Sequence, residues 1–203
     1  MSIMTACVVG ILVGGLSTRM GTAKALLRHP RGCSFAQNAM AVAREVTAEV
    51  VLLGEMISSD AHGTPVIPDA APAAGPLGGL CSLLEYAAPR YALLLACDLP
   101  FLRPALLWKL LAQASPEVDA VAYCRNGAPA TYHTCCALYS PTVLPAVKDR
   151  LARRALRMQD LLGSLSVAGL APTATENLQL TNVNSPAELH RCYEHWHTAR
   201  DSD

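Results

Sequence analysis

The chain has 203 residues, of which 52% are hydrophobic but only 5% aromatic, so we expect an aliphatic core of ordinary domain size. Sixteen basic side chains balance sixteen acidic ones, which argues against the basic surfaces that bind nucleic acid or acidic membranes. An anionic ligand would therefore need a local arrangement of charge. We expect a single domain over residues 1–203, with neither nucleic acid nor a membrane as a partner.

The first apolar run and the cysteines indicate a cytoplasmic protein. The run has no basic flank and is followed by glycines, unlike a secretory signal, and no apolar run reaches the roughly 18 residues of a membrane span. The eight cysteines form no CxxC pair. We expect reduced thiols and neither disulfides nor zinc, because five of the cysteines lie inside apolar runs: Cys7, Cys81, Cys97, Cys135 and Cys136.

Short apolar runs alternate with helical patterns along the chain, which is typical of an α/β fold with a mainly parallel sheet. The predicted buried strands, in chain order, are Cys7–Val13, Val50–Leu53, Tyr91–Cys97 and Val118–Tyr123, with further candidates at His133–Tyr139 and Leu178–Val183. This pattern shows no internal repeat and no linker.

Helix starts are well marked between these strands. Ser34 with Gln37, and Ser185 with Glu188, have the spacing of a capping box. Four prolines stand where a first helical residue is expected: Pro76, Pro104, Pro141 and Pro186. The segment Asp69–Gly79 is rich in proline, glycine and alanine, and we predict a loop there over the edge of the sheet.

The strongest functional signal is the segment that directly follows the first strand. It contains Gly14, Gly15 and Gly21 together with the cations Arg19 and Lys24. Glycines let backbone N–H groups face a triphosphate, and the two cations add charge that glycines lack. The spacing fits neither a Walker A loop nor a dinucleotide fingerprint. The alternative is an ordinary strand-to-helix turn with two solvated cations.

A single carboxylate, Asp98, ends the apolar run 93–97. This places it at the carboxyl edge of the sheet, where α/β proteins bind ligands, and one carboxylate completed by phosphate and water suits magnesium. The alternative is an aspartate that caps the following helix.

Two further segments are candidates for substrate contacts. In the first, Asp69 could accept from a base or sugar, while Gly75, Gly78 and Gly79 allow close approach of the backbone; the alternative is a flexible loop. In the second, two asparagines flank Val183, so their side chains would share one face of a strand. Their amide oxygens could complete a magnesium shell or hold a second substrate, or Asn184 could simply start the next helix. These asparagines are Asn182 and Asn184.

The remaining polar groups are less informative. His190, His195 and His197 fit a solvated helix face, and His133 is either an ordinary strand-end histidine or a neighbour of the second substrate. One small basic cluster could meet a phosphorylated acceptor or could simply be an exposed helix face: Arg153, Arg154 and Arg157.

Taken in order, the four segments resemble the molybdenum cofactor guanylyltransferases, the MobA family, over nearly the whole chain. The resemblance implies a three-layer α/β/α sandwich, a Rossmann-like fold of the nucleotide-diphospho-sugar-transferase type. It implies Mg²⁺-dependent transfer of GMP from GTP to the terminal phosphate of molybdopterin, with release of pyrophosphate. Molybdoenzyme maturation proteins are further candidate partners.

The resemblance also implies roles for individual residues. Arg19, Lys24 and Asp98 would be catalytic, and Asp98 would hold the metal. Asn182 and Asn184 would bind the acceptor. The nucleotide would contact Leu12, Val13, Gly14, Gly15, Lys24, Asp69, Gly78 and Asp98.

Three positions depart from the family pattern. Ala23 replaces the aspartate before the loop lysine, Val13 replaces an alanine, and Leu53-Gly54 lacks the asparagine expected near the base. Because polar contacts read base identity, a cytidylyltransferase acting on the same cofactor stays open. A nucleotidyltransferase with a sugar- or alcohol-phosphate acceptor and a non-catalytic nucleotide- or pterin-binding protein stay open as well.

Overall fold

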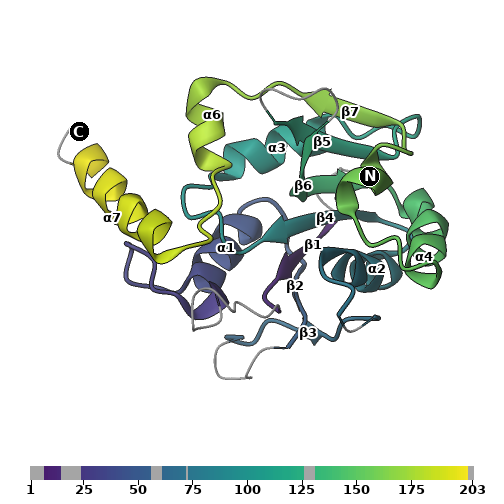
Figure 1. The fold of residues 1–203 in the computed structure, drawn as a ribbon, viewed down its shortest axis with the longest axis horizontal. Coiled ribbons are helices and arrows are strands. Elements are labelled where there is room, and N and C mark those ends of the chain that lie inside the picture. Colours follow the sequence, from purple (N-terminus) through teal and green to yellow (C-terminus); the bar gives the residue numbers. More distant parts are fainter. Residues whose placement is uncertain (1–6, 15–23, 56–60, 72, 126–130, 201–203) are drawn as a thin grey trace.

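The computed structural model describes residues 7–14, 24–55, 61–71, 73–125 and 131–200 (Figure 1). Their strands form one seven-stranded sheet in the order β3-β2-β1-β4-β6-β5-β7. The strands are β1 (Cys7–Leu12), β2 (Val50–Leu53), β3 (Val66–Ile67), β4 (Tyr91–Ala96), β5 (Ala120–Cys124), β6 (Tyr132–Tyr139) and β7 (Val167–Leu170). In the described part of the chain, no helix combines the length and apolar character needed to cross a bilayer.

The sheet is mainly parallel, as predicted. The pairs of β1 with β2 and β4, of β2 with β3 and of β5 with β7 are parallel. Only β6 runs the other way, antiparallel to both β4 and β5. The carboxyl ends of β1, β2, β3 and β4 therefore meet at one edge of the sheet, where ligands bind in folds of this class.

The helices are α1 (Phe35–Arg44), α2 (Pro76–Ala87), α3 (Pro104–Ala112), α4 (Leu144–Ala152), α5 (Met158–Leu162), α6 (Ala174–Gln179) and α7 (Pro186–Arg200), with 3₁₀ turns η2 (Lys24–Leu26) and η3 (Pro141–Val143). Four of the helices, α1, α2, α3 and α7, begin where the sequence signals place them. Ser34 and Gln37 form the predicted capping box at α1. All four marked prolines are first residues of a helix or 3₁₀ turn, because their fixed φ suits that position.

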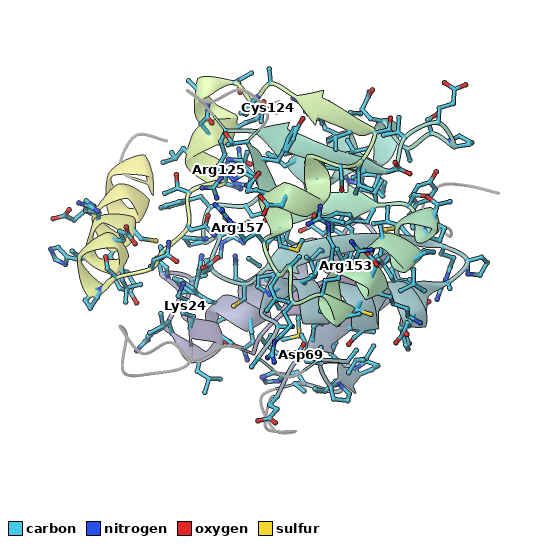
Figure 2. All side chains as sticks on the ribbon, turned by 45° about the vertical axis from the view of Figure 1, so that its right-hand side comes forward. Lys24, Asp69, Cys124, Arg125, Arg153 and Arg157 are labelled. Carbon is cyan, nitrogen blue, oxygen red and sulfur yellow. The ribbon has the colours of Figure 1, made fainter. Side chains whose placement is uncertain are left out.

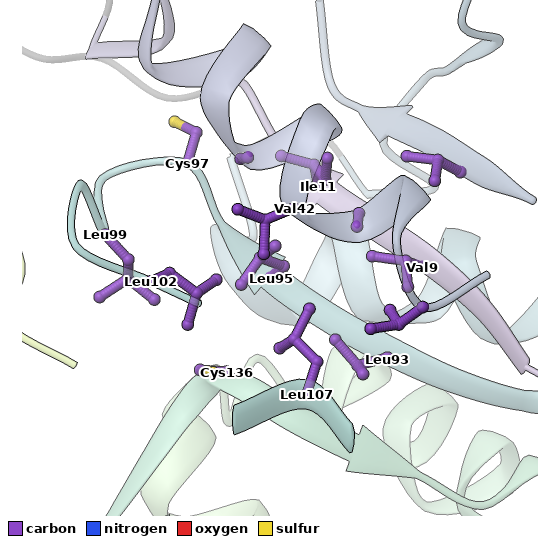
Figure 3. Packing of buried hydrophobic residues seen from close by; sticks show 14 of the residues in the cluster. Val9, Ile11, Val42, Leu93, Leu95, Cys97, Leu99, Leu102, Leu107 and Cys136 are labelled. Atoms are coloured by element: carbon purple, nitrogen blue, oxygen red, sulfur yellow. The ribbon is translucent and has the colours of Figure 1, made fainter. Parts of the chain in front are cut away.

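Two hydrophobic clusters cover the two faces of the sheet, which gives the expected three layers. Along β1, Val9 and Ile11 pack into the cluster that includes α1 and α3, whereas Val8 packs into the cluster of α2, α4 and α5. Figure 3 shows the first cluster, in which Leu99 and Leu102 lie beside the β4 residue Leu95. Core packing of Leu99 and Leu102 therefore holds the loop after β4 in place.

Two sequence-based predictions about local structure were wrong. Leu178–Val183 is not a strand: α6 covers its beginning, and the rest is irregular. Leu180 and Val183 are buried, so their apolar character serves the core from a loop. The segment Asp69–Gly79 is a loop only as far as Gly75, because α2 begins at Pro76.

All eight cysteines are free thiols, as predicted. Cys135 is only partly buried, unlike the other four cysteines assigned to apolar runs.

Candidate functional site

Four side chains predicted from three separate sequence segments meet at the carboxyl edge of the sheet. The Lys24 ammonium donates to Asp98 Oδ2 at 3.0 Å and to Asn184 Oδ1 at 2.5 Å. The Asn182 amide donates to Asp98 Oδ1 at 2.6 Å. Both carboxylate oxygens of Asp98 thus have a partner, and the four residues are called the Lys24–Asp98 cluster below.

Backbone contacts hold Asp98 in this position. Its carbonyl accepts from the Val183 amide at 2.9 Å, which ties the segment after α6 to the end of β4. Its side chain is 12% exposed and that of Lys24 is 25% exposed, so the pair lies at the surface of the site and is partly shielded from water. The prediction that Asn182 and Asn184 flank a strand residue was wrong, because this segment is irregular. Both side-chain amides nevertheless reach the cluster.

The start of α7 orients Asn184. The Ser185 hydroxyl accepts from the Glu188 amide at 3.2 Å, which is one half of the predicted capping box. The Glu188 carboxylate accepts from the amide of Asn184 at 2.6 Å. This hydrogen bond lowers the pKa of Glu188. Glu188 therefore helps to hold the backbone of Asn184, whose side chain accepts a hydrogen bond from the Lys24 ammonium.

The oxygens of the Lys24–Asp98 cluster suit a magnesium ion. One carboxylate and one amide carbonyl flank the Lys24 ammonium, and these are the hard ligands that magnesium prefers. Within the described ranges, no three His, Cys, Asp or Glu side chains converge on a common point that could hold a metal. A magnesium ion at Asp98 would take its other ligands from phosphate and water, as is usual in nucleotide sites.

Val13 and Gly14, which follow β1 directly, lie against the end of β2. The amides of Val13 and Gly14 both donate to the Leu53 carbonyl, at 3.0 and 3.3 Å. Gly54 has a φ of +107°, and a Cβ there would lie 2.8 Å from the Gly14 Cα. Only glycine allows these two backbones to come so close. The predicted contacts Gly15 and Arg19 lie outside the described residues.

Asp69 is held at the same edge by a serine that the sequence did not single out. The buried Ser82 hydroxyl of α2 accepts from the Ala70 amide at 2.7 Å and donates to the Pro68 carbonyl at 3.0 Å. Burial raises the pKa of Asp69, and the charge of Glu55 raises it further. The charge of Glu55 acts on Asp69, so Asp69 lies near the chain that follows the end of β2.

The glycines beside Asp69 serve the packing of the chain itself. A Cβ on Gly78 would lie 2.8 Å from the Ala71 carbonyl oxygen, and one on Gly79 would lie 2.5 Å from Leu12 Cδ2. The interpretation that these two glycines leave room for a ligand is therefore incomplete: their small size first lets α2 pack against its own loop and β1. Asp69 Oδ1 lies 3.5 Å from the same position on Gly79.

A second group of cations lies near the start of β6. In the view of Figure 2, Arg125 and Arg157 project above Lys24, whereas Arg153 projects to one side of them. Burial and the Arg125 charge lower the pKa of His133 to about 4, so its imidazole is neutral at pH 7. Arg153 forms an exposed pair with Asp149 one helical turn away, which fits the solvated-face interpretation for that residue.

The side chain of Gln159 holds the backbone at the start of β6, close to this second group. Its side-chain amide accepts from the Tyr132 amide at 3.1 Å and donates to the Tyr132 carbonyl at 2.7 Å, as a neighbouring strand would. The clamp joins α5, which begins just after Arg157, to the first residue of β6, which is next to His133. Neither Gln159 nor Ser82 belongs to a recognisable motif, so only the contacts reveal their roles. On α7, His190 is exposed and pairs with Glu194.

Comparisons with known proteins identify the family of the chain. The model of the MobA-like NTP transferase domain matches residues 9–167. A probable molybdenum cofactor guanylyltransferase of Pelotomaculum thermopropionicum is 32% identical over 88% of each chain. A molybdenum cofactor guanylyltransferase of Xanthomonas euvesicatoria is 33% identical over 89% of this chain and 91% of its own.

Solved structures share the fold. Molybdopterin-guanine dinucleotide biosynthesis protein A from Archaeoglobus fulgidus superimposes with a TM-score of 0.76 at 18% identity, covering 94% of this chain and 98% of its own. A 2-C-methyl-D-erythritol 4-phosphate cytidylyltransferase from Thermus thermophilus gives a TM-score of 0.67 at 17% identity, covering 92% of this chain and 97% of its own. The architecture is therefore shared by nucleotidyltransferases with different bases and acceptors.

Proposed function

Since the chain belongs to the MobA-like NTP transferase family, we propose that it transfers GMP from GTP to the terminal phosphate of molybdopterin, releasing pyrophosphate, with magnesium. The observation that carries this proposal is the Lys24–Asp98 cluster, in which a cation, a carboxylate and two amides meet at the end of β4, the strand that pairs with β1. The names of the relatives support guanine as the base and the molybdenum cofactor as the acceptor.

The proposed reaction is an in-line attack by an acceptor phosphate oxygen on the α-phosphorus of GTP. A new oxygen–phosphorus bond forms as the bond to the β-phosphate oxygen breaks, and the electron pair leaves with pyrophosphate. The acceptor is already an anion at neutral pH, so no side chain has to remove a proton. The protein's contribution is then positioning and charge neutralisation.

Lys24 and Asp98 have complementary parts in this scheme. When bound at Asp98, magnesium supplies positive charge to the phosphate oxygens and to the leaving pyrophosphate. Lys24 is a point charge on a flexible stem, so its ammonium can move from Asp98 to a phosphate oxygen when the nucleotide enters. Asn182 would keep the Asp98 carboxylate in place during that exchange, through the hydrogen bond that its side-chain amide already donates.

The two ends of the site suit the two substrates. Leu12, Val13 and Gly14 lie beside β2, and with Asp69 they would receive the nucleotide. Arg125 and Arg157 are exposed cations beyond the Lys24–Asp98 cluster, and we propose that they attract the acceptor phosphate together with Asn182 and Asn184. A guanidinium fork suits a phosphate because it can donate two parallel hydrogen bonds.

A pyrophosphate-release assay with purified protein tests this proposal. GTP, CTP, ATP and UTP are each offered with molybdopterin and Mg²⁺, and we expect release with GTP alone. We expect Asp98→Ala to lose about 10²–10³-fold in turnover, the usual effect of removing one electrostatic partner, whereas Asp160→Ala, at an exposed position on α5, should match the wild type.

Release with CTP alone would identify a cytidylyltransferase. Nucleotide binding without release from any of the four would leave a binding protein, and unchanged turnover in Asp98→Ala would remove this residue from the mechanism.

A further inference from the structure

His29 is a buried histidine that the functional motifs do not include. It is 1% exposed, and its ring packs edge-on against Phe35 with centroids 5.8 Å apart. Its Nε2 lies 2.9 Å from the Pro100 carbonyl oxygen, and its Nδ1 lies 3.1 Å from the Arg31 amide nitrogen. Because an amide can only donate, Nδ1 accepts, and the ring proton is on Nε2, which donates to Pro100.

The two partners of His29 connect the two halves of the Lys24–Asp98 cluster. His29 follows Lys24 by five positions, and the intervening turn is closed by the hydrogen bond from the Leu27 amide to the Lys24 carbonyl at 3.1 Å. Pro100 follows Asp98 by two positions in the loop after β4. The imidazole is therefore a bridge between the segment that carries the cation and the loop that carries the carboxylate.

The surroundings of the bridge extend it to the asparagines. Phe35, which contacts the His29 ring, belongs to a small apolar cluster with Val183, and Leu27 and Phe101 pack against this cluster. Val183 lies between the two asparagines of the site, and its amide donates to the Asp98 carbonyl. The His29 bridge thus packs on an apolar cluster in which Leu27, Phe101 and Val183 are each within three residues, along the chain, of a polar side chain of the site.

We propose that His29 is a positioning residue for the nucleotidyl transfer: its Nε2–H bond to Pro100 fixes the loop after β4, so that Asp98 faces Lys24 and Asn182. This inference rests on the proposed function. A neutral imidazole is required, because a ring protonated at both nitrogens cannot accept from Arg31. Burial lowers the pKa of His29, which agrees with a neutral ring.

An ordinary core histidine would stabilise the fold in the same place, so the test has to separate the two roles. Glutamine can put an amide nitrogen near the position of Nε2, whereas asparagine can put its amide oxygen only near that of Nδ1. We therefore compare His29→Gln, which keeps the donor to Pro100, with His29→Asn, which keeps only the acceptor for Arg31. His62→Asn is the matched control, since His62 is exposed and its φ of 48° is one that asparagine tolerates.

The first readout is amide hydrogen exchange in the protein without ligands. We expect the Val183 amide to exchange about tenfold faster in His29→Asn relative to the Leu94 amide in the central strand, because the loss of a buried hydrogen bond frees the Asp98 loop. His29→Gln and His62→Asn should stay within about threefold of the wild type by the same measure. If Val183 and Leu94 accelerate equally in His29→Asn, or if Gln and Asn behave alike, the positioning role is wrong.

The second readout is steady-state kinetics with GTP. We expect His29→Asn to lose about 10- to 100-fold in kcat with KM for GTP little changed, and His29→Gln to recover most of the loss, because misplacing a charged group affects the transfer step most. A kcat equal to the wild type in His29→Asn would overturn the inference. Wild-type protein that releases no pyrophosphate would contradict the proposed function instead, and the exchange measurement would still decide the role of His29.

Discussion

Two parts of the sheet are built by different means: the half that we propose binds the nucleotide, β1 to β3 (the nucleotide half), and the half that we propose receives the acceptor, β6, β5 and β7 (the acceptor half). In the first half every strand pair is parallel, and the glycine turn and Asp69 directly follow the strands β1 and β3 that position them. In the second half the chain reverses at β6, and the register between β5 and β6 shifts between Ala122 and Cys124. A side chain, Gln159, then supplies the hydrogen bonds at Tyr132.

The direction of a strand decides whether the sequence next to it marks the site. A parallel strand delivers the residues that follow it to one known edge, so a motif after the strand marks the site directly. A strand of the opposite direction delivers its first residues there, and long-range contacts have to complete the arrangement. We therefore expect substitutions that disturb the backbone to affect stability and substrate binding most in the nucleotide half. In the acceptor half, we expect the replacement of single side chains to have the larger effect.

The largest expected effect is at the boundary of the two halves. Lys24→Ala should lower turnover about 10²–10³-fold while the protein stays folded, because it removes a charge that offsets the phosphates. Lys148→Ala is the control, since that lysine pairs with Glu85 on the surface. Pyrophosphate release and circular dichroism measure the two quantities. Equal activity in the two variants would show that the Lys24 ammonium plays no part.

Two glycines of the nucleotide half should differ in their sensitivity to substitution by alanine. Gly54→Ala should destabilise the fold by about 1–3 kcal/mol, because the new Cβ meets the Gly14 backbone at a φ that alanine rarely adopts. It should also raise KM for GTP by displacing the turn after β1. Gly79→Ala meets only the end of the Leu12 side chain, which can rotate, and alanine favours a helix. Urea unfolding of both variants is the measurement, and a larger loss in Gly79→Ala would reverse the expected order.

Arginine variants test the acceptor half. We expect Arg125→Ala to raise the KM for the acceptor about tenfold and to leave the KM for GTP unchanged, in keeping with the loss of one charge-assisted hydrogen bond. Arg153→Ala removes the same charge from the exposed pair with Asp149 and should change neither constant. A rise in the KM for GTP alone would assign Arg125 to the nucleotide half.

The smallest expected effect is a shift in one titration. The pKa of His133 is lowered from 6.5 to about 4, mainly by burial and secondarily by Arg125. In Arg125→Ala the midpoint should rise but stay below 6.5, which NMR of the ring protons would show. Because the folded pKa lies below the unfolded one, neutral His133 adds stability that is present above about pH 6.5 and is lost as the pH falls toward 4. An unchanged midpoint would place Arg125 away from His133.

The sequence alone determined the strands β1, β2 and β4 and the capped start of α1, because hydrophobic period and capping are local signals. It also marked Lys24, Asp98 and both asparagines, since each stands beside a strand or helix end. The contacts among them join residues 74, 84 and 160 positions apart, and only the tertiary structure could decide those pairings.

The same reason explains what the sequence missed. Thr173 and Glu176 have the spacing of a capping box and could have revealed α6, but the apolar residues that follow suggested a strand. Other features leave no local pattern, because each depends on a backbone group supplied by another element. They are the direction of β6, the hydrogen bonds of Ser82 and Gln159, and the His29 bridge. Local sequence signals therefore identified the candidate reacting groups, and long-range packing determines how these groups are arranged relative to one another.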